Sequence, residues 1–329
     1  MEFLYCIPKS NPNSWANPSF SVGLTYTFGP VYSYGMEKAS VKSNLEAGAR
    51  KNVRSPRVTS FLAMLCLFTL CCWNDFSTDI DEYGGENWSF VVVGDSRSGG
   101  GIYSTLAGWI TQIRPMPVFA MHLGDMIPFP GNEFEWENFI RLSAPLMRSM
   151  DFYCTPGNHD VDNETSQVIY QRHVSLPGNE LYYSFFYNNI HFIVLDSEYP
   201  GQLGRIDDPQ KAWLETELGA VGPSFRIVVF LHRPVFSDTT HTLYNADELH
   251  NLFRTHNVIM VASGHEHRFH RTIQDGICYL ISGGGGSPLH NNFSGNYHHF
   301  MKISVFPTKL NVKTIGVFGE TIENFDLAL

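Results

Sequence analysis

The chain of 329 residues has only six cysteines, and their spacing suggests neither a disulfide framework nor a Cys-x-x-Cys zinc site. Three of them, Cys66, Cys71 and Cys72, lie in one apolar run. Cys154 and Cys278 lie in segments that we expect to be buried strands, where a thiol usually packs as a small apolar group. Stability must therefore come from a hydrophobic core, and 43% apolar residues can supply a sizeable one.

The chain also lacks an excess of positive charge. Its formal net charge is −10, and the acidic residues are concentrated after residue 72, where 29 Asp and Glu face 15 Lys and Arg. An acidic surface repels polyanions, so we expect no binding to duplex nucleic acid and no charge-driven docking on anionic lipid. A small phosphoester substrate stays compatible with this charge, because bound metal ions reverse the local field.

The apolar run at 58–73 has sixteen residues, fewer than the about twenty that span a bilayer. Basic residues precede it, and this order is typical of a secretory signal peptide. We expect 58–73 to be a signal peptide or a lipid or membrane anchor, with a buried helix as the alternative. Residues 1–57 would be an N-terminal extension absent from the mature protein, and 74–86 a linker. The catalytic domain would be 87–329, in a periplasmic, cell-surface or secreted protein, with a cytoplasmic location as the alternative.

Five apolar segments after residue 86 each end on side chains that can bind a metal ion. These side chains are Asp95, Asp125, Asn158, His232, and the pair His265 and His267. A single polar residue after a strand is usually a turn former, but five such endings in order are hard to explain as coincidence. Carboxylate, carboxamide and imidazole groups together suit Mn, Fe, Co or Zn better than Mg or Ca. The pattern therefore predicts a transition-metal centre.

The remainder of the chain alternates between expected strands and expected helices. Helices are expected at 102–113, 134–150, 208–218 and 246–256, a hairpin at 182–196, a strand at 276–282, and a final antiparallel pair at 299–305 and 310–317. This alternation predicts an α/β fold with two packed mixed β-sheets flanked by helices. His122 and His191 lie inside apolar strands, so we expect them to be core residues.

The ordered series Gly-Asp, Gly-Asp, Gly-Asn-His-Asp, a single His and Gly-His-x-His resembles the calcineurin-like metallophosphoesterase superfamily, over residues 87–316. The resemblance implies the four-layer sandwich of that superfamily and hydrolysis of a phosphomonoester or phosphodiester. It implies two metal ions bridged by Asp125, about 3.5–4 Å apart, which clamp the reacting oxygens and supply a metal-bound hydroxide as nucleophile. His159 would then act as general acid. The remaining implied ligands are Asp95 and His267 for the first metal, and Asn158, His232 and His265 for the second.

Two positions need separate interpretation. Asp160 is expected to orient the His159 imidazole, or else to cap the following helix. Arg97 stands where many members of the superfamily have a further His ligand to the first metal, and Pro128 stands where the purple acid phosphatase branch has a Tyr. The guanidinium of Arg97 suits a substrate phosphate oxygen. The alternatives are a structural ion pair and a weakened first metal site.

Residues flanking the motifs are further candidates to line the pocket: Arg233, Glu266, His290, His298 and His299. Substrate specificity is expected in the loops 160–181 and 198–208, which carry no readable motif. Two other functions remain open because fold alone does not guarantee activity. One is a metal-binding protein without catalysis, and the other is a membrane-tethered interaction protein. A free imidazole at His159 favours catalysis over a purely structural metal site.

Overall fold

The computed structural model describes residues 88–290 and 292–329. The expected extension at 1–57, the apolar run at 58–73 and the linker at 74–86 lie outside the described residues. Within the described part of the chain, no helix is both long enough and apolar enough to cross a bilayer.

The first sheet has six strands in the order β12-β11-β10-β1-β2-β3. Their bounds are β1 (Trp88–Val93), β2 (Phe119–His122), β3 (Asp151–Cys154), β10 (His299–Val305), β11 (Lys309–Gly316) and β12 (Thr321–Ala328). Strands β1, β2 and β3 are parallel, whereas β10, β11 and β12 add in antiparallel fashion beside β1. The carboxyl ends of β1, β2 and β3 therefore meet at one edge of the sheet.

The second sheet also has six strands, in the order β4-β5-β6-β7-β9-β8. Their bounds are β4 (Tyr183–Tyr187), β5 (Ile190–Val194), β6 (Arg226–Leu231), β7 (Val258–Ser263), β8 (Phe269–Gln274) and β9 (Ile277–Ser282). Its central strands β5, β6, β7 and β9 are parallel, and β4 and β8 are antiparallel at the edges. This mixed pairing in both sheets confirms the predicted fold class.

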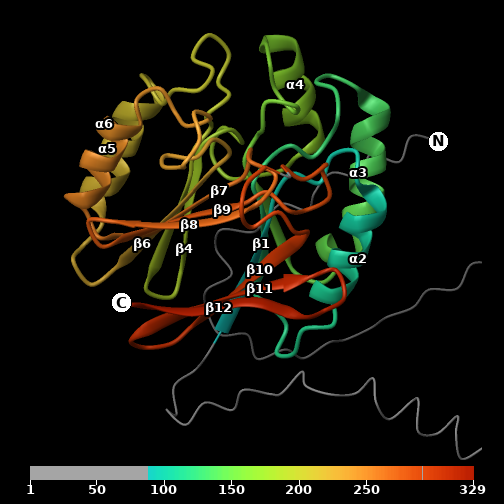
Figure 1. The fold of residues 1–329 in the computed structure, drawn as a ribbon. Helices are drawn as coiled ribbons and strands as arrows, with labels where there is room; N and C mark the ends of the chain where they lie inside the picture. The colour runs from blue at the N-terminus through green and yellow to red at the C-terminus, as the bar shows by residue number, and fades with distance from the viewer. Residues whose placement is uncertain (1–87, 291) are drawn as a thin grey trace, which may run out of the picture. The chain divides into compact units, whose positions relative to one another are not determined.

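Helices cover the outer faces of the two sheets (Figure 1). The helices are α2 (Gly100–Ile110), α3 (Glu133–Met147), α4 (Glu164–His173), α5 (Gln210–Ala220) and α6 (Ala246–Arg254). Buried residues of α2 and α3 pack on the first sheet, and those of α5 and α6 pack on the second. The layers are therefore helix, sheet, sheet, helix.

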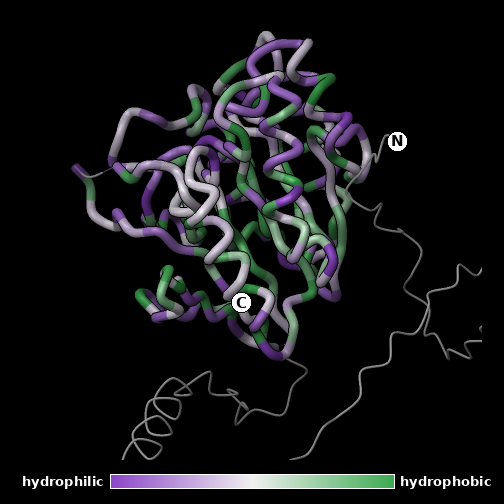
Figure 2. The backbone as a smooth tube through the Cα atoms, turned by 90° about the vertical axis from the view of Figure 1, so that its right-hand side faces the viewer, coloured by the Kyte–Doolittle hydropathy of each residue, from purple (hydrophilic) through white to green (hydrophobic). Residues whose placement is uncertain are grey.

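The alternation of side chains along β1 explains why the sheets stack. Phe90 and Val92 face the second sheet, whereas Val91 and Val93 face the helices. Between the sheets, Phe90 packs edge-on against Phe192 with ring centroids 5.3 Å apart. Burying one such side chain contributes about 1.5–3 kcal/mol. Figure 2 shows hydrophobic residues along the interior strands and hydrophilic ones mainly on the surrounding helices and loops.

Three elements differ from the sequence-based expectation. Helix α4 lies in the segment 160–181 that we expected to be a loop, and β8 and β12 were not expected. Helix α4 begins with a capping box between Asn163 and Ser166, but only two of its ten residues are buried, so it has almost no apolar stripe. The expected burial is otherwise confirmed: Cys154, Cys278, His122 and His191 all lie in the interior.

Candidate metal centre

The candidate ligands lie where the two sheets present the carboxyl ends of their parallel strands. Asp95 follows β1 and Asp125 follows β2, while His265 follows β7. These three residues have left-handed backbone conformations, with φ of 59°, 56° and 69°. Such conformations cost of order 1 kcal/mol or more in non-glycine residues and persist where the surroundings impose them. The backbone therefore turns sharply at each strand end and directs the side chain into the space between the sheets.

The glycines in the motifs allow this close approach. A Cβ atom on Gly157 would lie 2.2 Å from the backbone N of Asp125, and one on Gly124 would lie 2.7 Å from the backbone N of Gly157. No side chain fits at such distances. The glycines of the Gly-Asp and Gly-Asn pairs therefore allow the backbone of one motif loop to pack directly against the next.

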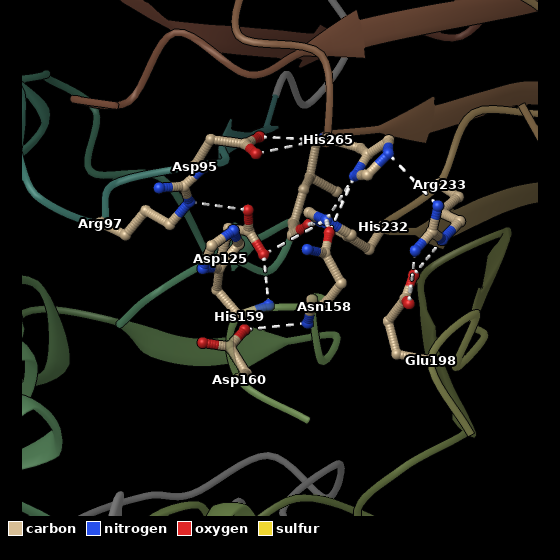
Figure 3. A network of polar contacts seen from close by, with 12 residues as sticks. Asp95, Arg97, Asp125, Asn158, His159, Asp160, Glu198, His232, Arg233 and His265 are labelled. Atoms are coloured by element: carbon tan, nitrogen blue, oxygen red, sulfur yellow. Dashed lines mark hydrogen bonds and ion pairs between the residues drawn. The ribbon is translucent and has the colours of Figure 1, made fainter. Parts of the chain in front are cut away.

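Four donor atoms meet at the expected position of the second metal (Figure 3). Asn158 Oδ1 lies 3.0 Å from His232 Nε2 and 2.9 Å from His265 Nδ1. His265 Nδ1 and His232 Nε2 are 3.2 Å apart, and Asp125 Oδ1 lies 3.3 Å from His232 Nε2. The family resemblance implied that these four residues share one metal, and the structure brings their side chains together.

The chemistry of this donor set fits a metal ion. His232 Nδ1 donates a hydrogen bond to the carbonyl of Leu123 at 2.8 Å, so the neutral ring presents a lone pair at Nε2. That lone pair faces the oxygens of Asn158 and Asp125, which are also hydrogen-bond acceptors. Asp125 Oδ1 accepts the backbone N–H of His159, but the one N–H that His265 could supply cannot satisfy both His232 Nε2 and Asn158 Oδ1. A cation at their centre removes the repulsion, as in sites built from histidine and carboxylate ligands.

The imidazole of His265 is held in its neutral form. Burial lowers its pKa to about 2, and the neighbouring His232 and Arg233 act in the same direction. Metal binding requires a neutral imidazole, so this ring needs no deprotonation near neutral pH. Asp125 is held in its ionised form by its neighbours. Although burial alone would raise its pKa, His232, His159 and Arg97 lower it to about 2.

The expected first metal position has a different composition. His267 Nδ1 donates to the carbonyl of Pro288 at 2.7 Å, so its Nε2 is an acceptor, and Asp95 Oδ1 lies 3.6 Å from it. Arg97 reaches into the same place. Its Nε donates to Asp125 Oδ2 at 3.0 Å, and its Nη2 lies 3.4 Å from His267 Nε2. Figure 3 shows Arg97 and the Asn158–His232–His265 group on opposite sides of Asp125.

The carboxylate of Asp95 accepts the backbone N–H of His265 on both oxygens, at 3.1 and 3.0 Å. Burial raises its pKa well above the usual range, and the Asp125 charge adds to this effect. One oxygen of Asp95, one of Asp125 and a ring nitrogen of His232 lie within 4.8 Å of one another. The atoms that could bind metal at the two expected positions therefore form one connected group.

His159 lies beside these donors without joining them. Its backbone N–H donates to Asp125 Oδ1 at 3.0 Å, and its ring Nδ1 donates to the carbonyl of Pro128 at 2.7 Å. The half-buried ring has its second nitrogen, Nε2, left without a hydrogen-bond partner among the described residues. This nitrogen is available to exchange a proton with a substrate.

The structure corrects the expectation for Asp160. Its fully buried carboxylate accepts the backbone N–H groups of Met126, Ile127 and Gly157, at 2.9, 3.2 and 2.9 Å. With these contacts, the Asp160 carboxylate does not orient the His159 ring. It does not cap α4 either, because the N-cap of that helix is Asn163. Asp160 instead ties the loop after β3 to the loop after β2, because three backbone donors converge on it.

The flanking candidates divide into two groups. Arg233 and His290 lie at the site: Arg233 Nη1 is 3.4 Å from His265 Nε2, and the His290 ring centroid is 4.7 Å from that of His267. The other three are held elsewhere. Glu266 bonds Arg268 and Ser237, His299 bonds Ser282, and His298 bonds the carbonyl of Gly284.

Two residues that lie at the site were not singled out in the sequence analysis. Glu198 is fully buried and pairs with Arg233 through two hydrogen bonds, of 2.7 and 3.0 Å. His241 stacks edge-on near His265, with ring centroids 5.9 Å apart. Glu198 is 35 residues from Arg233, and neither Glu198 nor His241 sits at a strand end, so no local pattern marked them.

Comparison with known proteins agrees with this geometry. Residues 89–269 match the profile of the family described as calcineurin-like phosphoesterase. The chain belongs to this family. Its relatives include the zebrafish (Danio rerio) serine/threonine-protein phosphatase CPPED1, 26% identical over 204 residues, covering 56% of this chain and 65% of that protein. Purple acid phosphatase 23 of Arabidopsis thaliana is 23% identical over 234 residues, covering 64% of this chain and 49% of that protein.

A solved structure supports the family fold. Purple acid phosphatase PPD1 from yellow lupin (Lupinus luteus) seeds superimposes with a TM-score of 0.63 at 18% identity, covering 74% of this chain and 54% of that chain. This likeness concerns the fold alone. The chain spans about half to two thirds of the length of the curated relatives described above.

Proposed function

We propose that this chain is a metal-dependent hydrolase of phosphomonoesters or phosphodiesters. The observation that carries the proposal is the meeting of three acceptor atoms, from Asp125, Asn158 and His232, with a free imidazole nitrogen of His159 nearby. A purely structural metal site has no use for that imidazole. The phosphatase names of the relatives are consistent with this reaction class.

The roles of the side chains follow from their contacts. A metal ion held by Asp125, Asn158, His232 and His265 would supply positive charge for the phosphoryl oxygens and raise the acidity of a water molecule. In its doubly protonated form His159 would carry a proton at Nε2 toward the leaving oxygen, while the Nδ1–H group stays on the carbonyl of Pro128 and fixes the ring. Arg97 keeps N–H groups free for a non-bridging phosphate oxygen. Asp160 positions the loop that carries Asn158 and His159.

The two-metal arrangement is the finer part of the expectation from the resemblance, with Asp95 and His267 completing the first position. Mn, Fe, Zn and Co all suit the donor types, so the metal's identity is open. Export through the segment 58–73, or anchoring by it, likewise stays part of the proposal. A metal-binding protein without catalysis is the competing function, and it draws on the presence of Arg97 in the first position.

The experiment measures metal content and turnover on the same samples. The purified chain is loaded separately with Mn, Zn, Fe or Co, and its metal content is determined by mass spectrometry. Hydrolysis of p-nitrophenyl phosphate and bis(p-nitrophenyl) phosphate is then followed. We expect turnover of at least one ester with a loaded sample, and loss of both metal and turnover in His232→Ala.

His270→Asn provides the matched control. His270 is a partly exposed histidine on the edge strand β8, and among the described residues its ring hydrogen-bonds only to Thr272 within that strand. This variant should keep the metal content and turnover of the parent. Metal binding without turnover of either ester would favour the non-catalytic function, and a parent chain that binds none of the four metals would refute the proposal.

A further inference from the structure

We infer that the guanidinium of Arg97 takes the place of the first metal, so that the chain holds a single metal ion at the Asn158–His232–His265 position. The resemblance implies two ions, so this departs from the expected centre. It rests on the proposed function only for the role of that one ion in catalysis. The number of metal ions that the chain binds can be measured independently of any catalysis.

The contacts of Arg97 match those that a first metal would make. Its Nε donates to Asp125 Oδ2 at 3.0 Å, the oxygen turned away from the second position. Its Nη2 lies 3.4 Å from His267 Nε2, whose lone pair is directed there because Nδ1 donates to Pro288. The acceptors of the first position thus already have a cationic partner from within the chain. Among the described residues, no Lys or Arg donates to Asn158 Oδ1 or His232 Nε2, the acceptors that belong to the second position alone.

The backbone holds Arg97 over this position. Its N–H donates to the carbonyl of Asp125 at 3.0 Å, and its carbonyl accepts from Ser287 Oγ at 3.1 Å. Ser287 is fully buried, and its own N–H donates to the carbonyl of Asp95 at 2.8 Å. The Cα of Arg97 is therefore tied both to the loop that carries Asp125 and to the loop after β9. The position of the backbone therefore places the Arg97 side chain within reach of the Asp125 carboxylate.

Charge and geometry both act against a second ion here. An arginine side chain is effectively always charged in proteins, so its positive charge is not removed to admit a metal. A divalent ion among Asp95, Asp125 and His267 would lie within a few ångströms of that charge. Arg97 also stands in the sequence position of a ligand, so the ion would have fewer protein donors.

The same side chain remains able to bind substrate. Of the five N–H groups of an arginine, one is used by Asp125 and one by His267, which leaves three. The side chain is 20% exposed, so those groups are accessible from the site. Arg97 would therefore neutralise the shared carboxylate and receive a phosphate oxygen, while the single metal ion acts from the other side of Asp125.

The test is a Mn(II) titration of the purified chain, with bound metal measured after desalting and by electron paramagnetic resonance. We expect one ion per chain at saturation, with the spectrum of an isolated Mn(II). His265→Ala should remove that ion, whereas His267→Ala should keep it, because His267 belongs only to the first position. Arg97→His, which restores a ligand and removes the charge, should take up a second ion and show a spin-coupled spectrum.

Arg97→Lys serves as the charge-retaining control and should stay at one ion. Circular dichroism checks that each variant is folded, and Arg97→Gln replaces Arg97→His if the latter does not fold; it should gain at least weak second-site binding. Two ions in the parent chain would overturn the inference and leave the proposed function intact. One ion that survives His265→Ala but is lost in His267→Ala would also overturn it. A folded Arg97→His with one ion would show that the arginine is not what excludes the second.

Discussion

Replacing Arg233 by alanine should destabilise the metal-free protein and, by a separate effect, strengthen metal binding. The guanidinium of Arg233 makes two hydrogen bonds to Glu198, of 2.7 and 3.0 Å, and the Glu198 carboxylate is fully buried. Removing one partner of a buried pair typically costs about 3–5 kcal/mol, because it leaves an uncompensated buried charge. The Arg233 side chain is 22% exposed, so water can enter the vacated space. Ser197 Oγ also continues to donate to Glu198. We therefore expect the lower end of the range, about 3 kcal/mol.

The effect on metal binding has a separate origin. Arg233 Nη1 lies 3.4 Å from His265 Nε2, the ring nitrogen that faces away from the candidate metal position. A guanidinium can only donate, so this contact keeps the proton of the neutral ring on Nδ1, the nitrogen that must be free to bind a metal ion. Without Arg233 that proton can move to Nε2, and a positive charge beside the site is gone. We therefore expect metal affinity to rise, by about 10–100-fold on the scale of changes next to a ligand ring. Urea unfolding of the metal-free variant measures the first effect, and a Zn or Mn titration measures the second.

The double variant Arg233→Ala with Glu198→Gln separates the two effects. Neutralising the carboxylate should recover much of the lost stability, because no buried charge is then unpaired. It should not reverse the gain in metal affinity, because His265 still lacks the neighbouring guanidinium. A loss of less than about 1 kcal/mol in Arg233→Ala, the scale of an exposed ion pair, would refute the reasoning about burial.

Further predictions concern proton transfer, pH, metal removal and export. His159→Asn should keep the bound metal and lower turnover by roughly 10²–10⁴-fold for esters of poor leaving groups. The loss should be smaller for nitrophenyl esters, because nitrophenol leaves without being protonated. An equal loss for both kinds of ester would exclude a general acid role. Burial lowers the pKa of His299 from 6.5 to about 4, so the unfolded chain binds a proton there that the folded chain excludes. Stability should therefore fall as pH drops from 6.5 to 4, by at most about 1.4 kcal/mol per pH unit from this group, and His299→Gln should show a shallower slope in pH-dependent urea unfolding. Chelation should lower the melting temperature, since metal at about 100 times its Kd contributes about 2.7 kcal/mol; an unchanged value would argue against a bound ion. If 58–73 directs export, the mass of the mature protein should correspond to a chain that begins after residue 57.

The strand ends were the most predictable part of this molecule. An apolar segment that ends on a ligand is a local pattern, so Asp95, Asp125 and His232 could be recognised from sequence alone as candidate ligands at strand ends, the first two in one sheet and the third in the other. Strand β8 was missed because only its first residue, Phe269, is buried. Strand β12 was missed for the same reason, since none of its residues is buried. A period-2 pattern is weak where both faces of a strand meet solvent.

The partners of individual side chains were less predictable. Asp160 follows His159 directly, so a role for that ring was the natural interpretation, yet its partners Met126 and Ile127 lie more than thirty positions earlier. Arg97 likewise contacts His267 across 170 positions. Contacts of this kind depend on how two loops pack, and no local pattern in either loop encodes the other.

The left-handed turns at Asp95, Asp125 and His265 bear on how such a protein could change over generations. Asparagine and glycine adopt this backbone conformation more readily than aspartate or histidine does. A lineage selected only for resistance to heat, with no demand for metal, would gain from either residue at these positions and would also lose the repulsion between buried carboxylates. Two acids and a histidine at three strained turns therefore lower the stability of the metal-free chain, a cost that a bound cation would offset.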